Sequence, residues 1–240
     1  TTTFYEGAEN NFYRRNADPF VFEMETDRTQ TGDLGRNNVL VSGLLGTSFK
    51  TGKSKYKLNI LHLQNGESTA GYFSQTLNFS DFVNFSKDNL EYTQRSITNA
   101  LLSGIHSSED ASWTTEWALS PTLSKIQDKD IRTTSFRVED GVYSIPQNNQ
   151  PKRIWRDLEE INAVAKLDLT KKYDFLEKDA KLKFGAYGSY KNRNFGILNF
   201  EIENNGSTTK FKGIADNILL EENLWTVNNN SGSYIDPDIS

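Results

Sequence analysis

The feature of this chain that most limits its fold is the alternation of apolar and polar residues between Trp113 and Asn199. In the first stretch the apolar positions are Trp113, Trp117, Leu119 and Leu123, and the positions between them are Thr114, Glu116, Ala118, Ser120 and Thr122. A period of two residues indicates a β-strand whose two faces meet different environments. These segments are also longer than the five or six residues of an ordinary strand. The pattern therefore predicts an all-β protein with long amphipathic strands.

The same alternation predicts six strands and two kinds of connection. We expect strands at about 38–50, 56–64, 90–105, 112–125, 158–169 and 181–191. Short turns at 51–55, 107–111 and 170–179 alternate with long polar loops at 1–36, 65–88, 127–152 and 192–240, and Phe195–Ile202 is a candidate extension of the last strand. This rhythm predicts a single antiparallel up-and-down sheet over residues 1–240, of the kind found in transmembrane β-barrels with short turns on one side and long loops on the other.

The aromatic residues near the short turns favour the membrane alternative. Trp113 follows one short turn, and Tyr173 and Phe175 lie in another, so we expect the three to lie together where an aromatic girdle meets the membrane interface. The alternative that stays open is a soluble barrel in which these residues cap the core. A hydrophobic fraction of 35% with no run of 18 apolar residues excludes a transmembrane helix but not a barrel, since only every second strand residue must face lipid.

Charge and motifs exclude several function classes. The net charge of −5 and the absence of a basic stripe argue against nucleic-acid binding. There is no cysteine, and His62 and His106 are the only histidines, so a zinc site is not expected. Asp128 and Asp130 are a candidate cation site, although a solvated acidic loop is favoured. No nucleotide-binding or hydrolase motif is present. We therefore expect no enzyme activity and no cofactor.

Three segments of the chain resemble the barrel of TonB-dependent outer-membrane receptors of the Bacteroidetes type. WTTEWALSPTLSKIQDKDIRTTSFRV (113–138) carries the charged D-x-R pair Asp130 and Arg132. PKRIWRDLEEINAVAKLDLT (151–170) is similar to the R-x-W-R-x-L-x-E-x-N strand of that family, and KLKFGAYGSYKNRNFGI (181–197) is similar to its K-x-K-F-G strand. NADPF (16–20) also resembles one of its loop motifs. The resemblance spans about residues 10–200.

This resemblance implies a location and a mode of action. The family's barrels have about 22 strands, so six or seven strands favour the middle part of a larger barrel in the cell outer membrane, and a complete smaller barrel of about eight strands is the alternative. By resemblance it takes part in import of a ligand, in contact with the lipid bilayer. The TonB complex drives the family through a plug domain, and no plug is seen here. The residues expected to face the lumen are Glu160, Asn162, Lys166, Asp168 and Lys183.

Aromatic residues in the expected loops are candidate contacts for a ligand or for a surface lipoprotein. They are Phe79, Phe82, Phe85, Tyr143 and Trp225. Packing of the loops against themselves is an equally good explanation of these residues. The alternative function is a secreted all-β module that binds carbohydrate or another ligand, and a secreted β-rich hydrolase is disfavoured because no convergent acid–base pair is seen.

Overall fold

The computed structural model describes residues 2–16, 18, 20–78, 82–147, 149–205, 211–226 and 231–238. Its strands are β1 (Thr2–Arg15), β2 (Met24–Thr51), β3 (Ser54–Asn78), β4 (Phe82–Ser107), β5 (Trp113–Glu139), β6 (Val142–Ser144), β7 (Lys152–Phe175), β8 (Lys178–Asn205) and β9 (Gly232–Asp238). Two short 3-10 helices, η1 (Ala215–Leu219) and η2 (Glu221–Asn223), precede β9. No helix in these ranges is long and apolar enough to cross a membrane.

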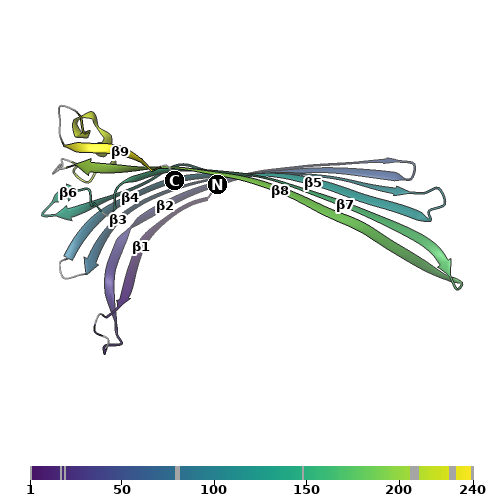
Figure 1. Ribbon diagram of the computed structural model, residues 1–240, viewed down its shortest axis with the longest axis horizontal. Coiled ribbons are helices and arrows are strands. Elements are labelled where there is room, and N and C mark those ends of the chain that lie inside the picture. Colours follow the sequence, from purple (N-terminus) through teal and green to yellow (C-terminus); the bar gives the residue numbers. More distant parts are fainter. Residues whose placement is uncertain are drawn as a thin grey trace.

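The strands form one antiparallel sheet in the order β1-β2-β3-β4-β5-β7-β8-β9, with β6 paired only to β5. Neighbours in the sheet are therefore neighbours along the chain, which is the expected up-and-down topology. Figure 1 shows a long twisted sheet whose strands run lengthwise from one end to the other. We call the end with the connections β2–β3, β4–β5 and β7–β8 the turn end, and the opposite end the loop end.

The strands are much longer than the sequence pattern predicts. β2 and β8 each contain 28 residues, which corresponds to a length of about 95 Å at about 3.4 Å per residue. The expected long loops at 1–36, 65–88, 127–152 and 192–240 are wrong for much of their length, because strands continue through them; β3 and β4, for example, pair as far as Asn78 and Phe82. Polar residues on both faces hid these strand extensions from a search for apolar–polar alternation. The expected extension over Phe195–Ile202 is confirmed.

Cross-strand register divides the side chains into two faces, which differ in the half of the sheet nearer the turn end. We call the face that carries Trp117 and Leu167 face A, and the face that carries Lys166 and Asp168 face B. One row across face A consists of Thr47, Leu58, Leu102, Leu119, Ala165 and Gly188, and the next of Phe49, Tyr56, Gly104, Trp117, Leu167 and Ala186. Neither row contains a charged residue. Face A therefore carries a continuous apolar band near the turn end.

The sheet is a single layer over most of its area. The accessible surface is 16326 Å², whereas a compact protein of this mass exposes about 11,000 Å². Apolar side chains in the middle of the band stay exposed, with Leu119 at 43% and Leu167 at 42%. The buried cluster Phe136, Ile202, Phe211 and Ile218 lies only at the loop end, where residues 211–219 pack on the sheet. Within the part of the chain that the structure describes, most of the apolar band has no second layer of protein over it.

Candidate functional site

The residues predicted to face a lumen all lie on face B. Glu160, Asn162, Lys166 and Asp168 are on β7, and Lys183 is on the neighbouring strand β8. The Asp168 carboxylate contacts the ammonium groups of Lys166, at 2.8 Å, and Lys183, at 3.2 Å. The alternation therefore predicted correctly which side chains share a face. Whether this face lines a lumen stays a prediction.

The ion pairs continue along the same two strands toward the loop end. The guanidinium of Arg193 donates to the Glu160 carboxylate from Nε at 2.7 Å, and Lys191 Nζ lies 3.3 Å from the same carboxylate. Lys183 Nζ also lies 3.6 Å from Glu116 on β5. On β5, β7 and β8, face B is therefore polar in this stretch and its charges are largely matched in pairs, whereas face A has no charged residue there.

Aromatic side chains gather on face A close to the turn end. The indole of Trp117 donates to Nε2 of His106 at 2.8 Å, which requires that nitrogen to be the unprotonated one. The rings of Tyr56 and His106 meet edge to face at 5.2 Å. The Trp113 ring contacts Phe184 in the same way, and the Lys171 ammonium lies 4.9 Å from its centre. Sequence analysis found Trp113 here but missed His106, which no motif distinguishes.

Trp117 depends on the absence of a side chain at Gly104. A Cβ atom built at Gly104 would lie 2.4 Å from the indole Nε1. Only glycine at this position lets the indole lie flat across β4. Gly188 occupies the same face on β8, and a Cβ there would meet nothing within 4 Å.

The loop aromatics predicted to contact a ligand or lipoprotein are not brought together. Phe79 lies outside the described residues, and of Phe82 only the backbone, in β4, is described. Phe85 is half-buried. It lies on face B, since it pairs with Arg137 on that face. Tyr143 packs on Phe136 on face A, with the rings 6.1 Å apart. Trp225 is 43% exposed beside β9, where its amide donates to the Ser233 carbonyl.

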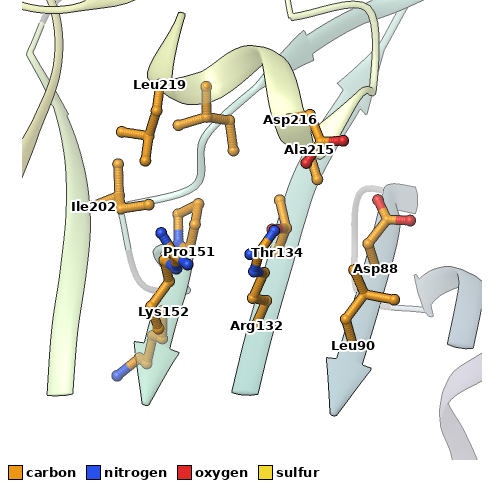
Figure 2. Close-up of a pocket in the computed structure, with 12 residues that line it drawn as sticks. Asp88, Leu90, Arg132, Thr134, Pro151, Lys152, Ile202, Ala215, Asp216 and Leu219 are labelled. Atoms are coloured by element: carbon orange, nitrogen blue, oxygen red, sulfur yellow. The ribbon is translucent and has the colours of Figure 1, made fainter. Parts of the chain in front are cut away.

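A cavity lies on face A at the loop end, between the sheet and the 3-10 helix η1. Its volume is about 100 Å³, and its floor comes from β4, β5 and β7. Figure 2 shows Asp88 and Leu90 beside Arg132 and Thr134, with Asp216 above them and Leu219 above Ile202. A shallower groove of about 550 Å³ continues from it over β3 and β2 to Tyr5 and shares Asp88, Leu90, Ala215 and Asp216 with the cavity.

A β-bulge in β5 places the basic residues of this cavity. Asp128 pairs with Arg156 and Ile131 with Ile154, so β5 holds one residue more than β7 between these pairs. Asp130 within the bulge has a φ of 65°, a left-handed conformation that Asp tolerates better than most residues. Beyond the bulge the even-numbered residues of β5 lie on face A. Arg132 consequently pairs with Leu90 on one side and Arg153 on the other.

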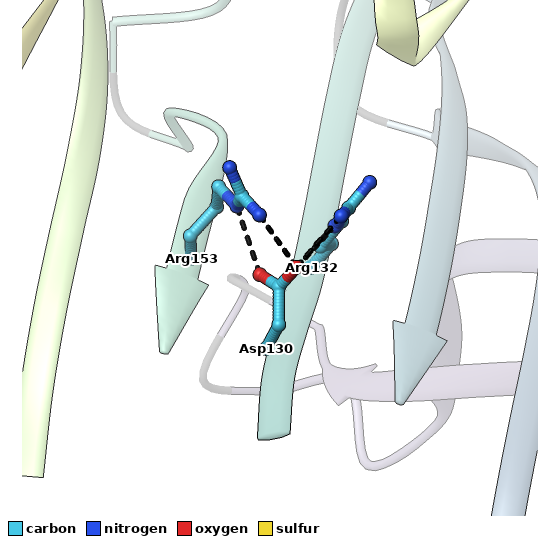
Figure 3. Close-up of polar contacts among 3 residues, drawn as sticks. All are labelled: Asp130, Arg132 and Arg153. Carbon is cyan, nitrogen blue, oxygen red and sulfur yellow. Dashed lines mark hydrogen bonds and ion pairs between the residues drawn. The ribbon is translucent and has the colours of Figure 1, made fainter. Parts of the chain in front are cut away.

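Asp130 holds the two arginines of the cavity in place (Figure 3). Its carboxylate accepts hydrogen bonds from Arg153 Nε at 2.8 Å and from Arg132 Nε at 2.8 Å and Nη2 at 2.7 Å. The hydrogen bond from Arg153 is the largest cause of the lowered pKa of Asp130, and Arg132 lowers it further. Asp128 is likewise bound, by Arg156 and by the Thr93 hydroxyl. The two aspartates therefore neutralise arginines rather than form the candidate cation site.

The opposite side of the cavity is acidic. Burial raises the pKa of the Asp88 carboxyl, and the nearby Asp216 raises it further. Neither carboxylate has a hydrogen-bond or ion-pair partner among the described residues. Within the same ranges, no three acidic or histidine side chains are grouped so as to hold a metal ion. The sequence missed Asp88 and Asp216 because no motif surrounds them and they lie far apart in the chain.

Comparison with models of known protein families finds no match, and comparison with curated proteins finds no similar sequence. The fold defines an all-β, antiparallel up-and-down sheet. Its function has to be inferred from the chemistry of its two faces.

Proposed function

We propose that this chain forms part of the barrel wall of a TonB-dependent receptor in the bacterial outer membrane and takes part in import of a ligand. The observation that carries the proposal is the uncharged apolar band on face A of a single-layer sheet. Such a band needs a nonpolar cover, while the ion pairs directly behind it on face B need water or a polar partner. A membrane barrel supplies both environments at once.

The height of the band supports the proposal. On β5 it runs from Thr115 to Leu123, and on β7 the partners run from Leu169 to Ile161. This is about the 9–11 residues that a tilted strand needs to cross a bilayer. Tyr56, Trp113 and Trp117 gather at the border of the band nearest the turn end. Aromatic girdles occupy such borders in membrane barrels. Beyond the band charged residues occur on both faces, and the apolar cluster around Phe136 is covered by residues 211–219, which suits strands that extend out of the membrane at the loop end.

The remaining parts of the proposal rest on the family resemblance. The TonB complex would act through a plug domain in contact with face B, where Glu160, Lys166, Asp168 and Lys183 lie. A surface lipoprotein would meet the loop end. The competing soluble module is disfavoured because a water-soluble sheet normally covers its apolar face with a second layer.

Spin labels on β7 would test the membrane assignment. The chain has no cysteine, so single cysteines can be placed at Asn162, Ala163, Val164, Ala165, Lys166 and Leu167 in the membrane-reconstituted protein. We expect oxygen, which concentrates in lipid, to reach labels at the odd positions, and a water-soluble nickel complex to reach labels at the even positions. The alternation follows directly from the two faces.

Labels at Thr29, Gln30 and Thr31 in β2 serve as the control. These positions lie on the loop-end half of the sheet, so the nickel complex should reach all three. If the odd positions of β7 are closed to both oxygen and nickel, the band is covered by protein and the membrane proposal is wrong.

A further inference from the structure

The cavity on face A is built from two neighbouring rows of residues that cross the strands. One row contains Asp33, Tyr72, Asp88 and Thr134, and the other contains Gly35, Ala70, Leu90, Arg132 and Arg153. The segment 213–219 lies over them as a roof, with Asp216 above Asp88 and Leu90 in Figure 2. The bulge in β5 is what brings Arg132 into the second row.

Charge is segregated along this floor. Arg132 and Arg153 share one carboxylate, Asp130, so this side keeps a net positive charge and guanidinium N–H groups that Asp130 does not use. Asp88 on the floor and Asp216 on the roof supply two carboxylates to the other side. Leu90, Ile218 and Leu219 add apolar lining to the cavity.

We propose that this cavity binds a small zwitterion of the α-amino-acid type, with its carboxylate on Arg132 and Arg153 and its ammonium group between Asp88 and Asp216. Bidentate contact with a carboxylate is the interaction that guanidinium groups make best. A cation between Asp88 and Asp216 relieves the repulsion of two carboxylates that share a partly buried site.

The size of the cavity limits the ligand. One water needs about 10–15 Å³ by the same measure, so about 100 Å³ holds roughly seven to ten water-sized groups. Glycine and alanine fit within that limit, whereas a larger side chain would have to enter the shallow groove toward Tyr72 and Tyr5. This assignment is independent of whether the sheet lies in a membrane.

Equilibrium dialysis of the whole chain with radiolabelled alanine tests the proposal, with acetate and ethylamine as competitors that each carry one of the two charges. We expect saturable binding of alanine, and competition by acetate or ethylamine at least tenfold weaker than by unlabelled alanine. Asp88→Asn and Arg132→Gln should each weaken alanine binding about tenfold or more, since each removes one charge-assisted contact.

Arg137→Gln is the matched control, because Arg137 lies on the same strand but pairs with Glu139 on face B; its alanine binding should equal that of the unmodified chain. Competition by acetate as strong as that by unlabelled alanine would show that the site binds anions. Competition by ethylamine of that strength would show that it binds cations. Either result, or no saturable binding at millimolar alanine, overturns the proposal. The competitor series uses the unmodified chain, so it decides the question even if a variant does not fold.

Discussion

At the scale of single residues, the packing on face A requires the missing side chain at Gly104 as well as the side chains that are present. The indole of Trp117 crosses β4 at Gly104 and reaches His106 on the same strand. Near the loop end, the single carboxylate of Asp130 orients two arginines that come from different strands. In both places one residue decides how several larger side chains are arranged.

Replacing Gly104 with alanine should displace the Trp117 ring. The new methyl group would lie 2.4 Å from Nε1, and overpacking of this kind costs about 1–3 kcal/mol. We expect a lower urea midpoint and an altered tryptophan emission spectrum. Gly188→Ala, on the same face but with open space at Cβ, should change neither. Equal effects of the two substitutions would show that the Trp117 contact does not stabilise the sheet.

Asp130→Asn should change how stability depends on pH. The pKa of Asp130 is lowered from 3.8 in the folded chain, so its charged form stabilises the fold at pH values above about 4, and this contribution is lost as pH falls through the lowered pKa. Asparagine tolerates the left-handed backbone. We expect the variant to be less stable than the unmodified chain at pH 6, and the gap in urea midpoints to narrow toward pH 3. A gap independent of pH would argue against this role.

At the scale of elements, the bulge in β5 shifts the phase of alternation. Before the bulge the odd-numbered residues of β5 lie on face A. After it the even-numbered residues, including Phe136, lie on face A. Phe136 is fully buried and packs against Phe211 with ring centroids 5.9 Å apart. The docking of 211–219 on the sheet, and with it the roof of the cavity, therefore depends on Phe136 lying on face A.

Two single-residue deletions in β5 should have opposite consequences. Deleting Lys129 removes the extra residue and leaves Arg132 and Phe136 on face A. Deleting Thr133, outside the bulge, moves Phe136 to face B because a shift of one residue reverses the faces. Hydrogen exchange of residues 211–219 should stay close to that of the unmodified chain in the first variant and become much faster in the second. Similar exchange in both would contradict the proposed role of Phe136.

At the scale of the whole molecule, the sheet has open edges along its apolar half. Among the described residues, β1 pairs with β2 only as far as Asn38, and β9 pairs with β8 only over Asn199–Asn205. The stretches 39–51 and 178–198 therefore each have one unpaired side. Unpaired backbone groups are costly in lipid, so a membrane wall requires further strands on both sides.

Hydrogen exchange of the isolated chain in detergent should reveal these edges. We expect fast exchange of those amides of 39–51 and 178–198 that point away from the sheet, and slow exchange in residues 158–169 of β7, which are paired on both sides. In an assembled barrel the edge amides should become as slow as those of β7. Slow exchange in the isolated chain at every protein concentration would show that the edges are already closed within one molecule.

Much of the fold could be predicted from the sequence. Alternation from Trp113 onward is a local property, so it determined the strand type, the order of the strands and the side chains that share face A or face B, including Lys166, Asp168 and Lys183. The extents of β3 and β4 beyond residue 65 could not be predicted in this way, because with polar residues on both faces hydrogen bonding to the neighbouring strand, rather than alternation, determines where they end.

The sequence by itself determined that this chain forms long antiparallel strands with one apolar face, since side chains alternate strictly along an extended backbone. Only the tertiary structure decided the arrangement at the loop end. It placed the bulge at Asp130, the pairing of Arg132 with Arg153, and Asp216 above Asp88, which is 128 positions away in the chain. These contacts depend on register between strands and on a segment that returns from beyond β8, and neither leaves a local signal in the sequence.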